Sequence, residues 1–187
     1  MIHNRVCPWW LCPTFDNPLR RLIHNPEAIL DGLVGEGQIA LDIGCGMGYF
    51  TIPMARMVGP QGWVVAVDLQ MKMLERVAQR ARRAGVDERI RIHQNTPDGI
   101  GLSEKVDFAL AFWMVHEVSE AEAFLGEVSG LLKPGGRFLL VEPRLHVSGA
   151  AFRATVEAAR GVGLRPEEER KVSLSRAVVL IKDAGGM

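Results

Sequence analysis

Three glycines and two aspartates have the types and spacing of a ligand-binding site. Gly44, Gly46 and Gly48 alternate with other residues directly after a short apolar run that contains Asp42, and Asp68 ends the next apolar run. Glycine lets the backbone turn sharply and approach a ligand closely, and the amides that open a following helix attract a carboxylate or phosphate. An ionised carboxylate only accepts hydrogen bonds, so Asp68 suits the hydroxyls of a ribose.

The glycine spacing separates two classes of nucleotide-like cofactor. A dinucleotide site typically has G-x-G-x-x-G, whereas this chain has G-x-G-x-G followed by Tyr49. The pattern therefore disfavours NAD, although an acidic residue such as Asp68 is common to both classes. We interpret Cys45 as a small residue that fills the loop, with a catalytic thiol as the alternative.

The elements that must position these residues alternate in type from Gln38 onward. We expect strands at 39–43, 63–68, 90–93, 106–113 and 137–142, and two short β runs at 172–174 and 177–181. We expect helices at 49–58, 71–84 and 148–160, and one more that a capping box of Ser119 and Glu122 begins. Such alternation predicts one α/β domain with a mostly parallel sheet and right-handed crossovers.

The first 35 residues differ from the rest. Asn17-Pro18 and Asn25-Pro26 predict the starts of two short helices, because asparagine caps helices and proline suits their first position. Before them lie Trp9, Trp10, Leu11 and Phe15, which are too apolar to stay in water. We expect residues 1–35 to form a lid over the acceptor side of a domain spanning 36–187. The alternative is a homodimer interface.

Composition excludes several classes of protein. The chain has 187 residues, 48% of them hydrophobic, and its 22 basic residues balance its 22 acidic ones. We therefore expect no nucleic-acid partner, because no net charge attracts a polyanion. No apolar run approaches the roughly 20 residues needed to span a bilayer, so we expect a cytoplasmic protein without a membrane partner. Three cysteines in such a chain predict free thiols.

Four segments together resemble one known family. They are LDIGCGMGYFT, VVAVDLQMKML, FWMVHEVSE and LLKPGGRFLLVEP, in that order between Gln38 and Pro143. The chain resembles the class I S-adenosylmethionine-dependent methyltransferases, in particular small members with little beyond the core. The resemblance implies a Rossmann-like, doubly wound sheet of seven strands with helices on both faces and an antiparallel C-terminal strand. It also implies S-adenosyl-L-methionine as cofactor and S-adenosyl-L-homocysteine as product.

The resemblance also implies roles for particular residues. Asp42 and the loop of Gly44, Cys45, Gly46 and Gly48 would hold the methionine end of the cofactor, and Asp68 would bind the ribose. The adenine would lie against the side chains of Leu69 and Met71, with Asn95 or Thr96 at its edge in place of the family's usual acidic residue.

The substrate side is less strongly specified. His116 follows the fourth predicted strand, where a general base would stand, and Trp113 would line the cavity for the cofactor or the substrate. Core packing is the alternative for both. A zinc site from His3, Cys7, Cys12 and His24 does not have a usual spacing, so we expect no metal. We predict methyl transfer to a small-molecule acceptor. The alternatives are a non-catalytic module that binds the cofactor, and a nicotinamide-dependent oxidoreductase.

Overall fold

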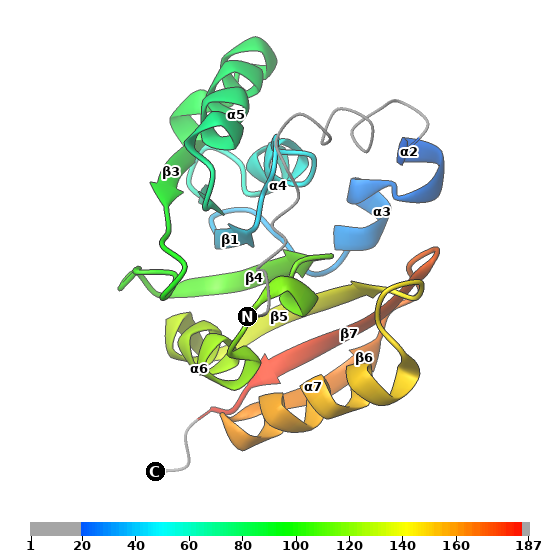
Figure 1. Ribbon diagram of the computed structural model, residues 1–187. Helices are drawn as coiled ribbons and strands as arrows, with labels where there is room; N and C mark the ends of the chain where they lie inside the picture. The colour runs from blue at the N-terminus through cyan, green and yellow to red at the C-terminus, as the bar shows by residue number, and fades with distance from the viewer. Residues whose placement is uncertain (1–19, 185–187) are drawn as a thin grey trace. The chain divides into compact units, whose positions relative to one another are not determined.

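The computed structural model describes residues 20–184, which divide into two compact units, 20–101 and 102–184 (Figure 1). Seven strands are ordered β3-β2-β1-β4-β5-β7-β6 in the sheet. The first three belong to unit 20–101 and the last four to unit 102–184. The predicted fold class, a Rossmann-like mixed sheet of seven strands, is confirmed.

In unit 20–101 the strands β1 (Ile39–Ile43), β2 (Trp63–Asp68) and β3 (Ile90–Gln94) are parallel. In β1 and β2 every residue after the first is buried, as expected for strands with both faces covered. The helices of this unit are α2 (Arg20–Ile23), α3 (Pro26–Leu30), α4 (Thr51–Met57), α5 (Met71–Ala84) and the short 3-10 helix η1 (Asp87–Arg89).

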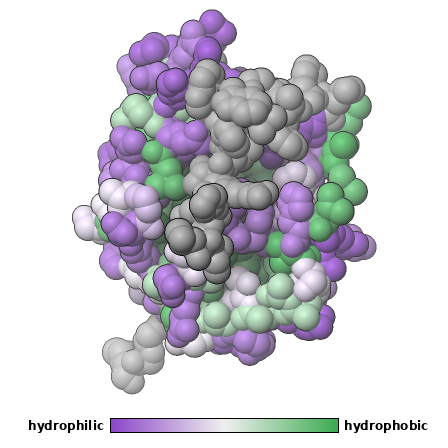
Figure 2. Space-filling view, in the orientation of Figure 1, coloured by the Kyte–Doolittle hydropathy of each residue, from purple (hydrophilic) through white to green (hydrophobic). Residues whose placement is uncertain are grey.

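Local sequence signals explain where several of these helices begin and end. The side chain of Asn25 accepts a hydrogen bond from the Ala28 amide and caps α3, as predicted, with Pro26 at its first position. Helix α5 ends at Gly85, whose φ of 65° lies in the left-handed region that glycine adopts readily. The outer face of α5 is hydrophilic, as Figure 2 shows in its upper part.

In unit 102–184 the strands are β4 (Val106–Phe112), β5 (Leu132–Pro143), β6 (Leu164–Glu169) and β7 (Ser175–Lys182). Strands β4 and β5 are parallel, and β7 runs antiparallel to both β5 and β6. Figure 1 shows β7, in red, between β5 and β6. The helices are η2 (Val115–Glu117), α6 (Ala121–Leu131) and α7 (Gly149–Gly161).

Two predictions for this unit are wrong. The run 172–174 is not a strand; β6 instead lies at Leu164–Glu169, where three consecutive glutamates hid the strand pattern. This sequence is tolerated because β6 is the last strand in the sheet order, and the side chains of an edge strand reach water. Ser119 and Glu122 do not form a capping box, since α6 begins after Glu120 and no side-chain hydrogen bond caps it.

The remaining boundaries differ by a few residues from the predicted ones. Helix α4 begins at Thr51 rather than at Tyr49, and β5 begins at Leu132 rather than at Arg137. The N-cap of α7 is Ser148, whose hydroxyl accepts the Ala151 amide. Within residues 20–184, no helix is both long enough and apolar enough to cross a membrane.

Candidate functional site

The glycine loop after β1 is held by the end of β2. The amides of Gly44 and Cys45 both donate to the carbonyl of Val67, at 2.8 and 2.9 Å, and the Gly46 amide donates to Oδ2 of Asp68 at 3.0 Å. Three loop glycines, Gly44, Gly46 and Gly48, have φ values of 69°, 53° and 84°. Only glycine adopts such angles without strain, so this spacing of glycines is what lets the loop form.

Asp68 retains capacity for a ligand after holding the loop. Its Oδ2 accepts the Gly46 amide, and its Oδ1 accepts the Gln70 amide at 2.9 Å. A carboxylate offers about four acceptor positions, so two hydroxyls of a ribose can still be accommodated. Burial raises the pKa of Asp68, and the two backbone hydrogen bonds partly oppose that shift.

Asp42 is a second carboxyl group near the loop, at the next-to-last position of β1. It is 3% exposed, and the Thr51 hydroxyl donates to its Oδ2 at 2.5 Å. Burial raises the pKa of Asp42 to about 7, the Thr51 hydrogen bond lowers it, and the negative charge of Asp68 raises it further. A positively charged ligand near this pair would favour the ionised form.

Space is available where a ligand would approach the loop. A Cβ atom added at Gly46 would meet nothing within 4 Å, although its φ would remain strained for any other residue. Gly44 is exposed. At this loop the backbone therefore borders open space, and the carboxyl groups of Asp42 and Asp68 belong to the two strands β1 and β2 beside it.

The residues expected around an adenine follow β2 and β3. Met71 is 45% exposed and Leu69 is partly exposed, so both have apolar surface to offer a flat ring. The Gln94 side chain donates to the Leu69 carbonyl at 3.0 Å and ties the two strand ends together. Asn95 donates to the Thr96 carbonyl at 3.2 Å, so its amide serves the local turn in this structure.

Tyr49 joins the start of α4 to α2. Its hydroxyl donates to the His24 carbonyl at 2.7 Å, and the Arg20 guanidinium lies 4.2 Å from the centre of its ring. The positive charge of Arg20 also lowers the pKa of Asp42. The part of the proposed lid that the structure describes is therefore attached to the residue that directly follows the glycine loop. Trp9, Trp10, Leu11 and Phe15 lie outside the described residues, as do His3, Cys7 and Cys12.

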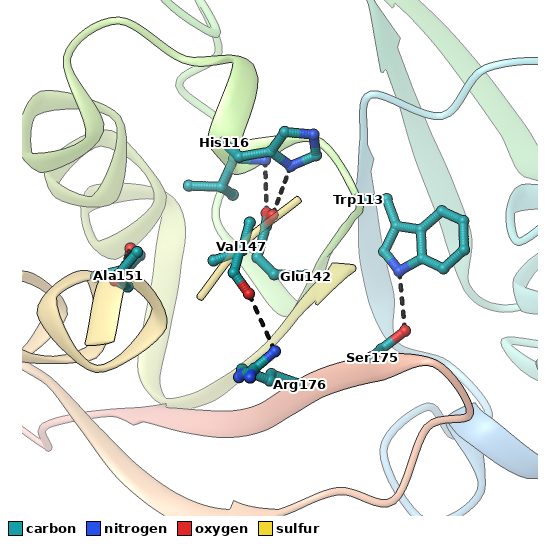
Figure 3. A network of polar contacts seen from close by, with 9 residues as sticks. Trp113, His116, Glu142, Val147, Ala151, Ser175 and Arg176 are labelled. Atoms are coloured by element: carbon teal, nitrogen blue, oxygen red, sulfur yellow. Dashed lines mark hydrogen bonds and ion pairs between the residues drawn. The ribbon is translucent and has the colours of Figure 1, made fainter. Parts of the chain in front are cut away.

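Unit 102–184 carries a polar network at the carboxyl ends of β4 and β5 (Figure 3). His116 Nδ1 lies 2.5 Å from Oε2 of Glu142, and the Val115 amide donates to Oε1 at 2.9 Å. Trp113 has a φ of 62°, unusual for a bulky residue, and its indole donates to the Ser175 hydroxyl at 2.9 Å. Backbone strain of this kind is concentrated at functional sites.

The model of the methyltransferase domain family matches residues 40–136. The chain belongs to this family. It is similar to the demethylmenaquinone methyltransferase of Lactobacillus johnsonii, with 30% identity over 110 residues that cover 58% of this chain and 45% of that protein. It is also similar to the ubiquinone/menaquinone biosynthesis C-methyltransferase UbiE of Escherichia fergusonii, with 32% identity over 58% of this chain and 44% of that protein. The chain thus spans less than half the length of these relatives.

Solved structures agree on the fold. A SAM-dependent methyltransferase from Aquifex aeolicus superposes with a TM-score of 0.84 at 23% identity, covering 94% of this chain and 99% of that one. TrmN from Thermus thermophilus has a TM-score of 0.69 at 26% identity, covering 84% of this chain and 48% of that one. The predicted class I methyltransferase is confirmed, and with it an enzyme domain whose cofactor is S-adenosylmethionine.

The residues of unit 20–101 fit this cofactor. Its sulfonium and ammonium groups are positive, its ribose carries hydroxyls and its adenine is flat. The chain offers the Asp42 carboxyl group, the acceptor positions of Asp68 and the apolar surface of Met71 in matching order along the strand ends.

Sequence reasoning missed Thr51 and Glu142. Thr51 carries no motif of its own. Glu142 did carry a signal, because it is a charged residue at the end of the apolar run Phe138–Val141 and is 2% exposed. A buried charge requires a partner, which here is His116.

Proposed function

We propose that this chain transfers the methyl group of S-adenosylmethionine to a small-molecule acceptor. The observation that carries the proposal is the glycine loop held by Asp68, with open space at Gly46, inside the segment that matches the methyltransferase domain family. The cofactor supplies a methyl group on a positively charged sulfur, which is already a good leaving group. The protein then has to bind the cofactor and the acceptor, align the two reacting groups, and exclude water from them.

The cofactor-binding roles are assigned to residues of unit 20–101. Asp68 accepts the ribose hydroxyls, and the Asp42 carboxyl group, near the loop of Gly44, Cys45, Gly46 and Gly48, favours the positive methionine end. Leu69 and Met71 cover the adenine, with Asn95 or Thr96 at its edge. The loop geometry and the burial of the two carboxyl groups support this assignment.

The substrate-side roles are assigned to His116 and Trp113. His116 acts as the general base, and Trp113 lines the cavity for the cofactor or the acceptor. Support comes from their place directly after β4, since ligands of open α/β sheets bind beyond the carboxyl ends of the strands. Residues 1–35 form the acceptor-side lid. The contacts of Arg20 and His24 with Tyr49 support that role.

The acceptor class takes its support from the names of the relatives. One is named for demethylmenaquinone and the other for ubiquinone/menaquinone biosynthesis. A ring that bears phenolic hydroxyls is therefore the first acceptor to test. A cytoplasmic location stays a prediction. So does the absence of nucleic-acid and membrane partners, and a homodimer stays an open alternative.

The direct test is transfer of labelled methyl. The protein is incubated with S-adenosyl-[methyl-³H]methionine and a panel of hydroquinones, phenols, amines and thiols, and S-adenosylhomocysteine is measured alongside. We expect turnover with at least one small molecule, and a much lower rate with the Asp68→Ala variant when the cofactor is kept near the wild-type Kd. Cofactor binding without turnover across the whole panel would favour a non-catalytic binding module instead.

A further inference from the structure

Glu142 is a buried carboxyl group whose two oxygens both bind the segment that follows β4. It is 2% exposed at the end of β5. Its Oε1 accepts the Val115 amide at 2.9 Å, and its Oε2 lies 2.5 Å from Nδ1 of His116. Figure 3 shows the two contacts side by side, with the second ring nitrogen of His116 pointing away from Glu142. The Glu142 carboxylate therefore holds both the backbone of η2, at Val115, and one of its side chains, that of His116.

These contacts decide which nitrogen of His116 carries the proton. An ionised carboxylate can only accept hydrogen bonds, so Nδ1 must donate to Glu142. The neutral imidazole then has its lone pair on Nε2, the nitrogen that can accept a proton from another molecule. The hydrogen bond to Glu142 raises the pKa of His116, burial opposes that shift, and the charges of Glu142 and Glu117 add to it.

The surroundings of His116 also bear on its proton. The ring of His146 lies 5.8 Å from that of His116, centre to centre. Two arginines of the same edge hold backbone carbonyls: Arg144 Nε donates to Ser175 at 2.8 Å, and Arg176 Nη1 donates to Val147 at 3.0 Å. These arginines bind backbone carbonyls, whereas the His116 ring contacts the carboxylate of Glu142.

We propose that Glu142 is a positioning residue that orients His116 to remove a proton from the methyl acceptor at Nε2, so that the acceptor is a compound with an ionisable O–H group rather than a thiolate. This inference rests on the proposed function. The acceptor's O–H bond breaks, the proton goes to Nε2, and the electron pair left on that oxygen forms the new O–C bond to the methyl carbon. The sulfur keeps the electrons of the broken C–S bond, and the imidazolium returns its proton to solvent.

A purely structural role for Glu142 makes different predictions. If Glu142 served only to hold η2 through the Val115 amide, loss of its charge would leave the pKa of His116 and the pH dependence of the rate unchanged. Glutamine at position 142 retains an acceptor oxygen and nearly the same shape but loses the charge. Glu142→Gln therefore separates the two roles. Glu122→Gln, on the exposed first turn of α6 in the same unit, is the matched control.

The first test reads the imidazole directly. The protein is labelled with ¹⁵N histidine, and the His116 signals are assigned by their loss in His116→Asn. We expect the Nδ1-H tautomer in the wild type, and a lower pKa of His116 in Glu142→Gln but not in Glu122→Gln. An Nε2-H tautomer, or the same pKa in Glu142→Gln as in the wild type, would overturn the proposal.

The second test measures the turnover of hydroquinone and thiol probes by the wild type, by His116→Asn and by Glu142→Gln. We expect turnover of a hydroquinone, a loss of about 100-fold in kcat for His116→Asn, and unchanged cofactor affinity. In Glu142→Gln the rise of kcat with pH should move to lower pH and reach a lower plateau. Turnover of thiols alone, or full activity of His116→Asn, would overturn the proposal. Absence of turnover with every probe would count against the proposed function. The tautomer of His116 from the first test would still show whether Glu142 orients the imidazole.

Discussion

The carboxylate of Asp68 accepts a hydrogen bond from the amide of Gly46 at 3.0 Å, so the end of β2 holds the loop that follows β1. The same side chain is the one assigned to the ribose. One residue thus shapes the loop and, in the proposed site, would also present acceptor oxygens to the cofactor. Loss of this side chain should therefore affect cofactor binding more than the fold.

Asp68→Ala is expected to weaken binding of S-adenosylmethionine by about 1.5–3 kcal/mol, the usual range for hydrogen bonds to a charged group. Calorimetric titration measures the change. Asp87→Ala in η1 is the control, because it removes an exposed carboxylate from the same unit without touching the loop. Equal affinities for Asp68→Ala and the wild type would place the ribose elsewhere.

Gly46 and Gly85 provide a matched pair of substitutions. Both have positive φ, 53° and 65°, and an added Cβ would meet nothing within 4 Å at either position. Replacing either by alanine should therefore cost a similar 1–2 kcal/mol of backbone strain. Only Gly46→Ala should abolish cofactor binding, because its methyl group would occupy the space into which the ligand fits. Chemical denaturation and calorimetry of both variants test this, and retained binding by a folded Gly46→Ala would contradict the loop assignment.

The raised pKa of Asp42 predicts how stability depends on pH. Its folded pKa is about 7 against an ordinary value of 3.8, so the folded state binds more protons between these values. The free energy of unfolding must then fall as pH rises through that window. Asp42→Asn removes this dependence while keeping an oxygen for the Thr51 hydroxyl. We expect its stability relative to the wild type to rise by about 2–3 kcal/mol between pH 5 and pH 8. A constant difference across that range would show that Asp42 ionises normally.

Tyr49 is expected to attach α2 through two separable contacts. Tyr49→Phe removes the hydrogen bond to the His24 carbonyl but keeps the ring under Arg20, and should cost about 1 kcal/mol of unfolding free energy. Tyr49→Ala removes both contacts and should cost more. Urea denaturation of the two variants measures the costs. Identical stabilities for the wild type and Tyr49→Phe would mean that the hydroxyl does not hold α2 in place.

The sequence predicted the parts of the fold that depend on local signals. The apolar runs at Ile39–Ile43 and Trp63–Asp68 became buried parallel strands, and Gly85 ended α5 as expected. Strand β6 was missed because its pairing with β7, rather than its own residues, makes it a strand. Local pattern cannot reveal such a long-range contact.

The site divides in the same way. The glycine loop and Asp68 were identified as candidates because glycines in a tight loop and a carboxylate at a strand end suit the proposed ligand by their residue types alone. The contact between His116 and Glu142 joins residues that are 26 positions apart, and only the parallel pairing of β4 with β5 brings them together. The sequence showed His116 as a candidate but not the carboxylate that orients it.

The measurement that tests the central claim most directly is calorimetric titration of the full chain with S-adenosylmethionine, S-adenosylhomocysteine and NAD under one set of conditions. The loop of Gly44, Gly46 and Gly48, with Tyr49 where a dinucleotide site has its third glycine, predicts saturable binding of the first two ligands and none of NAD. Binding of NAD as tight as that of S-adenosylmethionine, or no binding of S-adenosylmethionine at all, would contradict the assignment of this site.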